Sequence, residues 1–290
     1  IDGGKASDWY PLSKPALPPI HINGNAEFLN YAKLYGWPGN GTPTNPYRID
    51  GYDIDGNGGT YCVWIENTDV WFVVQNCNVW NATNTATAPY GTGIYLNNVK
   101  NGTLENNNCS ANSGGGIVLT YSSNNNITNN NCSANSENGI DLYYYSSNNN
   151  ITNNNCSANS YGIDLVDSSY NTITNNNCSA NSYGIYLDSS SNNIITNNNC
   201  SANSYYGIYL GSSSNNNITN NNCSANSYIG IYLAYSSNNT ITNNNCSANS
   251  WNGIYLYYSS NNNTITNNNC SANSWNGIYL DYSSNNNTIT

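Results

Sequence analysis

Two aspartates occupy the same position in two consecutive Gly-Ile-Asp-Leu segments. They are Asp141 and Asp164, and Asp167 follows shortly after the second. Two stacked carboxylates can hold a cation, because oxygen ligands of this kind suit calcium. The alternative is a solvated pair that binds nothing. A hydrolase needs a paired acid and base with tuned pKa values, and two acids alone do not establish that.

A second acidic segment, residues 53–58, reads Asp-Ile-Asp-Gly-Asn-Gly and matches the first half of a calcium-binding EF-hand loop. The Glu that closes such a loop is replaced by Trp64, so we interpret this segment as a turn between strands. We expect no metal site and no cofactor. The weak candidates for metal ligands are Asp53, Asp55, Asn57, Asp141 and Asp164.

Tyrosine holds the position of Asp141 and Asp164 in most other repeats. The predicted outward aromatic column consists of Tyr186, Tyr209, Tyr232, Tyr255 and Tyr279. Tyrosine rings can stack on sugars, or they can form a lateral contact between rods, because aromatic rows rimmed by polar residues are common at interfaces. The sequence leaves both interpretations open.

Cysteine marks the repeat most regularly. The recurring cysteines, 22–24 residues apart, are Cys109, Cys132, Cys156, Cys178, Cys200, Cys223, Cys246 and Cys270. If they point inward they act as small apolar side chains. Stacked strands lie about 4.8 Å apart, which is also within reach of a disulfide between successive coils. We favour buried thiols over disulfides. A metal site is not expected, since C-x-x-C pairs and His partners are missing.

Short apolar patterns must position these residues. Each repeat holds an Ile and a Cys five residues apart, as in Ile173 and Cys178, followed by Gly-Ile-x-Leu. Such pieces predict short strands, and the Asn, Ser and Gly between them predict turns. Length varies only in the turns, because a slip within a strand would turn its side chains to the wrong face. The pattern predicts an all-β parallel β-helix of about 23 residues per coil and about nine coils.

Stacking of identical coils also predicts side-chain ladders. Our candidate is the Asn of Ala-Asn-Ser, as in Asn181, Asn203 and Asn226. We assign residues 1–46 to an N-terminal arm and cap and residues 47–290 to the β-helix. Its first coils are divergent, and residues 101–290 are near-identical repeats. In the cap we expect a short helix over residues 26–35, capped by Asn25 and ended by Gly36.

The charge distribution excludes several classes of partner. The chain has a net charge of −10, and none of its five Lys and Arg residues follows Lys100. Nucleic acids and anionic membrane surfaces need clustered basic residues, so neither is an expected partner. No run of 18 apolar residues exists, so we expect no membrane insertion. The chain begins at Ile1 without an initiator Met, which we interpret as a processed end.

Acceptor sequences for N-glycosylation are dense, which is typical of an exposed surface in a secreted chain. The candidate acceptors are Asn126, Asn150, Asn155, Asn177, Asn217, Asn238 and Asn262. An Asn-rich sequence also produces such triplets by chance. We predict an extracellular or cell-surface location.

The repeated Gly-Ile-Tyr-Leu and Asn-Thr-Ile-Thr-Asn-Asn elements resemble the NosD-type, pectate-lyase-like right-handed parallel β-helix repeats. The resemblance covers roughly residues 45–290, and residues 45–55 resemble the opening segment of such proteins. It implies a right-handed solenoid in a secreted or cell-surface protein, often archaeal. A polysaccharide lyase of that superfamily would need a basic catalyst and clustered acids, often with calcium, whereas the coils after Lys100 contain no Lys, Arg or His. The fold hosts lyases, hydrolases, adhesins and structural proteins, so the resemblance does not settle function.

Near-uniform repeats favour a protein that provides length and a uniform surface, since a catalytic β-helix needs one coil to differ. We therefore predict a non-enzymatic extracellular structural protein, the subunit of a self-assembling fibre, sheath or surface layer. Its partner would be its own copy, stacked head to tail through residues 1–60 and an uncapped tail. The alternative is a carbohydrate-binding or adhesin module that uses the tyrosine column on glycans. A polysaccharide lyase or hydrolase relic ranks third.

Overall fold

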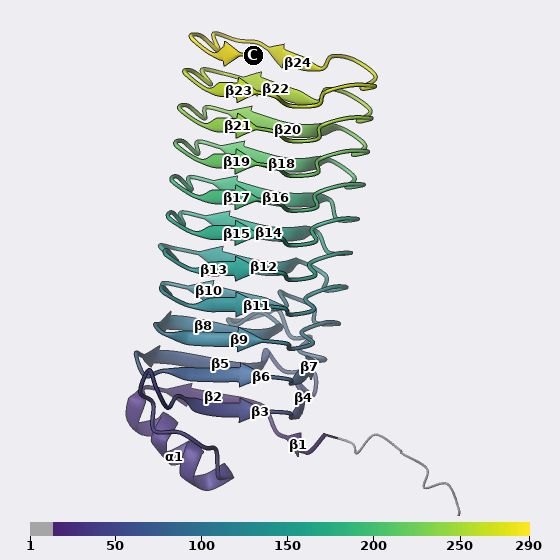
Figure 1. Cartoon of the computed structure of the whole chain (residues 1–290). Helices are drawn as coiled ribbons and strands as arrows, with labels where there is room; N and C mark the ends of the chain where they lie inside the picture. Colours follow the sequence, from purple (N-terminus) through teal and green to yellow (C-terminus); the bar gives the residue numbers. More distant parts are fainter. Residues whose placement is uncertain (1–13) are drawn as a thin grey trace, which may run out of the picture.

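The computed structural model describes residues 14–290 as a rod of stacked coils (Figure 1). Each coil contributes one strand to each of two parallel sheets, and both sheets contain eleven strands. The predicted all-β parallel β-helix is confirmed, with more coils than the nine predicted. The number of coils was underestimated because the first coils contain few of the residue types that define the repeat. Residues 1–13 of the predicted arm lie outside the described residues, and the boundary at residue 46 stays a prediction.

One sheet, here called the long-strand sheet, runs the whole length of the rod. Its strands in spatial order are β2 (Ile20–Asn23), β5 (Tyr61–Thr68), β8 (Thr92–Val99), β10 (Ile117–Thr120), β12 (Asn138–Tyr143), β14 (Tyr161–Val166), β16 (Tyr183–Asp188), β18 (Tyr206–Gly211), β20 (Ile229–Ala234), β22 (Ile254–Tyr257) and β24 (Ile278–Leu280). Gly-Ile-x-Leu forms the centre of the repeated strands. The glycine is required because a Cβ on Gly207 would lie 2.6 Å from the carbonyl oxygen of Gly230 in the next coil.

The second sheet, the short-strand sheet, carries the Thr-Ile-Thr segments. Its strands are β3 (Tyr47–Asp50), β6 (Phe72–Gln75), β9 (Gly102–Glu105), β11 (Asn126–Thr128), β13 (Asn150–Thr152), β15 (Thr172–Thr174), β17 (Ile194–Thr196), β19 (Asn217–Thr219), β21 (Thr240–Thr242), β23 (Thr264–Thr266) and β25 (Thr288–Ile289). A third face begins with β1 (Ala16–Leu17), β4 (Asp53–Asp55) and β7 (Asn78–Trp80). It continues as single bridges between asparagines, from Asn108 to Asn269.

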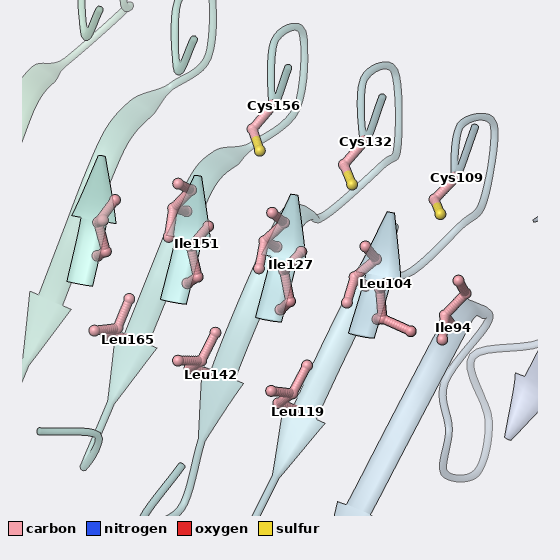
Figure 2. Close-up of a cluster of buried hydrophobic side chains, with 14 of the residues drawn as sticks. Ile94, Leu104, Cys109, Leu119, Ile127, Cys132, Leu142, Ile151, Cys156 and Leu165 are labelled. Atoms are coloured by element: carbon pink, nitrogen blue, oxygen red, sulfur yellow. The ribbon is translucent and has the colours of Figure 1, made fainter. Parts of the chain in front are cut away.

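Identical residues stack on one another because successive coils pair in register. Ile173 pairs with Ile195, and Leu165 pairs with Leu187. Their side chains fill a narrow interior, where Figure 2 shows Ile, Leu and Cys of successive coils pointing inward. The core is therefore a set of columns, each of which buries one apolar side chain per coil.

The corners between strands use left-handed backbone conformations. In one coil Ser189, Asn192, Asn197 and Ala202 have φ between 51° and 60°. Asn adopts this region readily, whereas for other L residues it costs about 1–2 kcal/mol. Ala stands at the same corner of each repeat, so other interactions must hold that corner in place.

Buried asparagines supply those interactions. The predicted ladder is confirmed: the backbone N–H of Asn181 donates to Oδ1 of Asn203, and that of Asn203 donates to Oδ1 of Asn226, each at 2.9 Å. The sequence analysis missed further buried columns of the same kind. They include Asn176, Asn198, Asn221 and Asn244; Asn171, Asn193, Asn216 and Asn239; and Ser168, Ser190, Ser213 and Ser236. Each buried amide satisfies backbone groups that the corner withdraws from the sheet ladders.

A short helix covers the first coils. Helix α1 (Asn25–Tyr35) ends at Gly36, which is left-handed as predicted. Phe28 lies between Tyr47 and Phe72, with ring centroids 5.1 and 5.2 Å away. The predicted cap by Asn25 is wrong, because its Oδ1 accepts a hydrogen bond from Thr68 instead and Gly24 holds the capping position. In residues 14–290 no helix has the length and apolar character to cross a bilayer.

The cysteine column lies in the interior. The seven residues from Cys109 to Cys246 are fully buried, Cys270 is partly exposed, and all ten cysteines are free thiols. Figure 2 shows Cys109 and Cys132 beside the isoleucine and leucine columns. Burial raises the pKa of Cys178 well above its usual range, which disfavours the reactive thiolate.

The buried amides can be tested at Asn221, which is 1% exposed. Its Oδ1 accepts from the backbone N–H of Asn198 at 2.9 Å, and its Nδ2 donates to the carbonyl of Ile195 at 2.8 Å. Asn221→Ala leaves both groups unpaired, so the free energy of unfolding should fall by about 2–4 kcal/mol in urea titrations. Asn217→Ala, the same change on the outer face of β19, should alter it by less than about 0.5 kcal/mol. Equal effects would contradict the role of the buried ladder.

The buried thiols can be tested by titration with a chromogenic disulfide reagent. In the native protein only Cys270 should react, and Cys270→Ser should abolish that signal. After denaturation without a reductant all ten cysteines should react. Fewer than ten reactive thiols in the denatured chain would show that disulfides join successive coils.

Candidate functional site

One line of outward side chains follows the long-strand sheet from end to end, and we call it the outer column. Strand register places His21, Trp64, Tyr95, Val118, Asp141, Asp164, Tyr186, Tyr209, Tyr232, Tyr255 and Tyr279 in it, in this order. The sequence analysis missed His21 and Trp64. They lie in Ile-His-Ile and Val-Trp-Ile segments, where one residue stands between two apolar ones as Tyr does in Ile-Tyr-Leu. This alternation could have assigned His21 and Trp64 to the outer column.

A groove lies over strands β8, β10 and β12, with a cavity of about 500 Å³. Tyr95, Val118 and Asp141 of the outer column line it. The groove is hollow there because Val118 and Asp141 replace tyrosines, and because Gly114 and Gly115 before β10 carry no side chain.

Two segments outside the sheet form the remaining lining of the groove. Residues 88–90 belong to the insertion between β7 and β8, and Tyr121, Tyr143 and Tyr144 belong to the ends of β10 and β12 and the turns that follow them. The rings of Tyr121 and Tyr144 stack with centroids 5.7 Å apart. An unrepeated loop of this kind has no sequence pattern that predicts where it folds.

The structure brings the two predicted aspartates together. Asp141 of β12 pairs directly with Asp164 of β14, so their side chains leave the sheet side by side. Oδ1 of each carboxyl is sealed from solvent and has no hydrogen-bond partner among the described residues. A buried, unpaired carboxylate is costly, which favours a shared proton over two negative charges.

Burial raises the pKa of both carboxyl groups above the usual range. For Asp141 the neighbouring Glu137 carboxylate adds to this effect, and for Asp164 the charges of Asp141 and Asp188 do so. A pair with one protonated and one ionised member can donate a proton to one atom and accept a proton from another.

Aromatic rings extend along the outer column on both sides of the acidic pair. On one side His21 stacks on Trp64 at 4.1 Å, and Trp64 meets Tyr95 edge-on at 6.0 Å. On the other side Tyr186 and Tyr209 stack at 4.5 Å with an interplanar angle of 2°. Tyr232 and Tyr255 continue this series at 5.4 Å per step. Burial raises the pKa of Tyr186, so its hydroxyl stays neutral.

A second aromatic row lies beside the outer column. Tyr161 and Tyr183 stack at 4.9 Å, and Tyr161 meets Tyr186 of the outer column edge-on at 5.3 Å. Further along, Trp251 stacks on Trp275 at 4.6 Å. The long-strand sheet thus presents a broad aromatic surface with a pair of carboxylates set within it.

The other candidate metal ligands do not join the acidic pair. Asp53 and Asp55 lie on the third face of the rod, where each accepts a hydrogen bond at 2.7 Å from the amide of an asparagine in the next coil. Oδ1 of Asp55 also accepts from the backbone N–H of Asn57, which forms a local turn. Among residues 14–290 no three His, Cys, Asp or Glu side chains are grouped to hold a metal ion.

The candidate glycosylation acceptors fall into two structural groups. Asn155 and Asn177 belong to an outward ladder, where the amide of Asn177 donates to Oδ1 of Asn155 at 2.9 Å. A glycan on that nitrogen would disturb the ladder. The others lie on the short-strand sheet or at its turns: Asn126, Asn150, Asn217, Asn238 and Asn262. Their modification stays a prediction.

Two family models match the chain. The model described as a right-handed beta helix region matches residues 39–185, and that of the periplasmic copper-binding protein (NosD) matches residues 142–269 and 225–290. The protein belongs to the right-handed parallel β-helix family, with NosD-type repeats. The predicted resemblance is confirmed, whereas an archaeal origin stays a prediction. No curated protein sequence matches the chain.

Solved structures share the fold at low sequence identity. A point mutant of the periplasmic alginate epimerase AlgG has a TM-score of 0.69 at 15% identity, covering 95% of this chain and 79% of its own. The enzymatically active domain of tailspike protein 2 from bacteriophage CBA120 has a TM-score of 0.61 at 13% identity, covering 88% and 42%. DFA-IIIase from Arthrobacter chlorophenolicus A6 has a TM-score of 0.59 at 14% identity, covering 83% and 69%.

These neighbours correct the prediction that the protein is not an enzyme. All three are enzymes or enzymatically active domains, and each shares the fold over most of this chain. Our prediction assumed that near-uniform coils cannot carry catalysis. That assumption was wrong because enzymes are found on the same parallel β-helix fold.

The raised pKa of the acidic pair predicts a dependence of stability on pH. The folded chain retains a proton that the unfolded chain releases above about pH 4, so stability should fall as the pH rises through the raised pKa. Asp141→Asn removes one ionisable group of the pair. It should exceed the wild type in unfolding free energy by about 1–3 kcal/mol at pH 8 and match it at pH 4. The same gain in unfolding free energy at both pH values would contradict this. So would a gain of the same size at pH 8 in the control variant Glu105→Gln, on the short-strand sheet.

Proposed function

We propose that the protein hydrolyses glycosidic bonds of a polysaccharide that lies along the outer column. The observation that carries the proposal is the half-buried pair of Asp141 and Asp164, each with one oxygen sealed from solvent, beside a groove and between two series of aromatic rings. Rings in series suit a chain of sugars, because each combines apolar ring surface with a polar group that can form hydrogen bonds with sugar hydroxyls. Carboxylates at one point of such a track would define the place of cleavage.

Acid–base hydrolysis follows from a pair that shares one proton. The protonated carboxyl donates to the glycosidic oxygen as the bond between that oxygen and the anomeric carbon breaks. The ionised carboxylate forms a bond to the anomeric carbon as the leaving oxygen departs, which suits two carboxyls on directly paired strands. Water then replaces this carboxylate at the anomeric carbon and gives its proton to the first carboxyl. The products are two shorter chains, one with a new reducing end, and both carboxyls regain their starting states.

Hydrolysis fits the described residues better than elimination or epimerisation. Both of those reactions remove a proton next to a sugar carboxylate, and that carboxylate must be neutralised for the proton to leave. No Lys, Arg or His follows Lys100 in the sequence, and the groove lining contains none. The acidic pair supplies protons to a leaving oxygen, but it cannot neutralise a sugar carboxylate.

We place the protein in the cell envelope or outside the cell. The matching NosD family is described as periplasmic, and so is the alginate epimerase with the same fold. A polysaccharide substrate of the envelope or the medium is consistent with this location. Assembly of copies head to tail into a fibre stays a prediction.

Binding of a polysaccharide without cleavage is the second candidate. The stack from Tyr186 to Tyr255 favours it, since these rings extend well beyond the acidic pair. A protein that only binds would retain the aromatic track and have no use for buried carboxyls.

The two candidates are separated by product analysis. The wild type, incubated with a panel of plant, fungal and bacterial polysaccharides, should release new reducing ends from at least one. Asp141→Asn and Asp164→Asn should each lower the rate by about 10²–10⁴-fold and still bind the substrate, whereas Glu105→Gln, on the short-strand sheet, should match the wild type. Binding without products would establish the second candidate, and neither binding nor products would reject both.

A further inference from the structure

The charges around the groove are all of one sign. Glu137 and Asp141 line it, Asp164 lies in the next coil, and Asp188 lies one coil further on. We infer that the groove takes a glycan without carboxylate or sulfate groups, a neutral or amino-substituted chain. This inference rests on the proposed function and names the substrate class of the same site.

The basic residues among residues 14–290 lie away from the groove. Those within the described part are Lys14, Lys33, Arg48 and Lys100. Nζ of Lys14 donates to Asn78 on the third face, and Nη1 of Arg48 donates to Gln75 on the short-strand sheet. Lys33 is in helix α1, and Lys100 follows the far end of β8. None of them lines the groove, so an acidic sugar there would find no positive partner.

His21 does not change this balance. It stands at the first position of the outer column, four strands before Asp141. Its Nε2 lies 2.8 Å from Oε1 of Glu66, so any positive charge on the ring is already matched by a carboxylate. Over the described residues the outer column therefore offers aromatic faces, hydroxyls and negative charge, but no free cation.

An acidic glycan would be repelled at this surface. Each of its carboxylates would lie close to Glu137 or the acidic pair, where like charges disfavour binding and low salt strengthens the effect. A second anion would also oppose ionisation of the pair and so remove the carboxylate that attacks the anomeric carbon. An amino-substituted sugar meets the opposite situation, because its cation faces both carboxylates and tyrosine rings. By this property the site would differ from one that acts on alginate, which is a polymer of acidic sugars.

Matched ligands test the inference. Cellohexaose, maltohexaose and mannohexaose are each compared with the same oligosaccharide after oxidation of its 6-hydroxyl groups to carboxylates, by calorimetric titration of the wild type at low salt. At least one neutral hexamer should bind, and its oxidised form should bind about tenfold more weakly or worse. An oxidised hexamer that binds as tightly as its neutral parent would overturn the inference and leave the proposed function in place. Absence of binding by all six would overturn both.

A charge reversal provides an independent measurement. Glu137 is exposed on the wall of the groove, and Glu137→Lys should raise the affinity for the oxidised hexamer about tenfold. The quantity compared is the ratio of the affinities for the oxidised and the neutral hexamer, which should rise by about the same factor. Glu105→Lys makes the same change of charge on the short-strand sheet and should alter neither affinity. Equal effects of the two variants, or no effect of Glu137→Lys, would contradict the assignment of the groove as the site of charge selection.

Discussion

In-register parallel pairing of successive coils is the constraint on which the rest of the molecule depends. With strands about 4.8 Å apart, every side chain meets its own counterpart in the next coil. A side chain is tolerated only if it packs well against a copy of itself. Ile, Leu, Cys and Tyr do so through apolar contact. Asn does so because its backbone N–H and its side-chain amide both donate to Oδ1 of the next Asn. The near-identical repeats are a direct result of this selection.

The same constraint explains how a site can arise on so uniform a scaffold. An outward position of the repeat forms a column along the whole rod, so it provides a continuous surface even when all coils are alike. Replacing tyrosine by valine and aspartate in three consecutive coils then creates a hollow and a carboxyl pair together. Asp141 and Asp164 are forced together by the register, and burial beside other carboxylates raises the pKa of both. The scaffold therefore brings two carboxyl groups together without any new fold.

The features that repeat could be predicted from the sequence. Periodicity identified the strands, the inward cysteines and the outward tyrosines, because each recurs many times at the same position of the coil. Trp64 and His21 were not predicted, because the first coils have the spacing of the repeat but few of its residue types. Two features depend on segments that occur only once in the chain, so no repetition reveals their structure. One is the groove wall formed by residues 88–90, and the other is the cap of helix α1 by Gly24 in place of Asn25. The prediction that the protein is not an enzyme failed because uniformity of the scaffold was taken for uniformity of the surface.

The likeness of the repeats also has a consequence for how the chain reaches its native state. If any coil can stack on any other, a growing rod that skips one coil loses little pairing energy, and the skipped segment is left as a loop. The divergent first coils and helix α1 reduce this ambiguity, since Phe28 packs against Tyr47 and Phe72, which the later coils do not repeat. Growth from that end, one coil at a time, gives each new segment a single free edge to join. The least repetitive part of the chain thus sets the alignment of the most repetitive part.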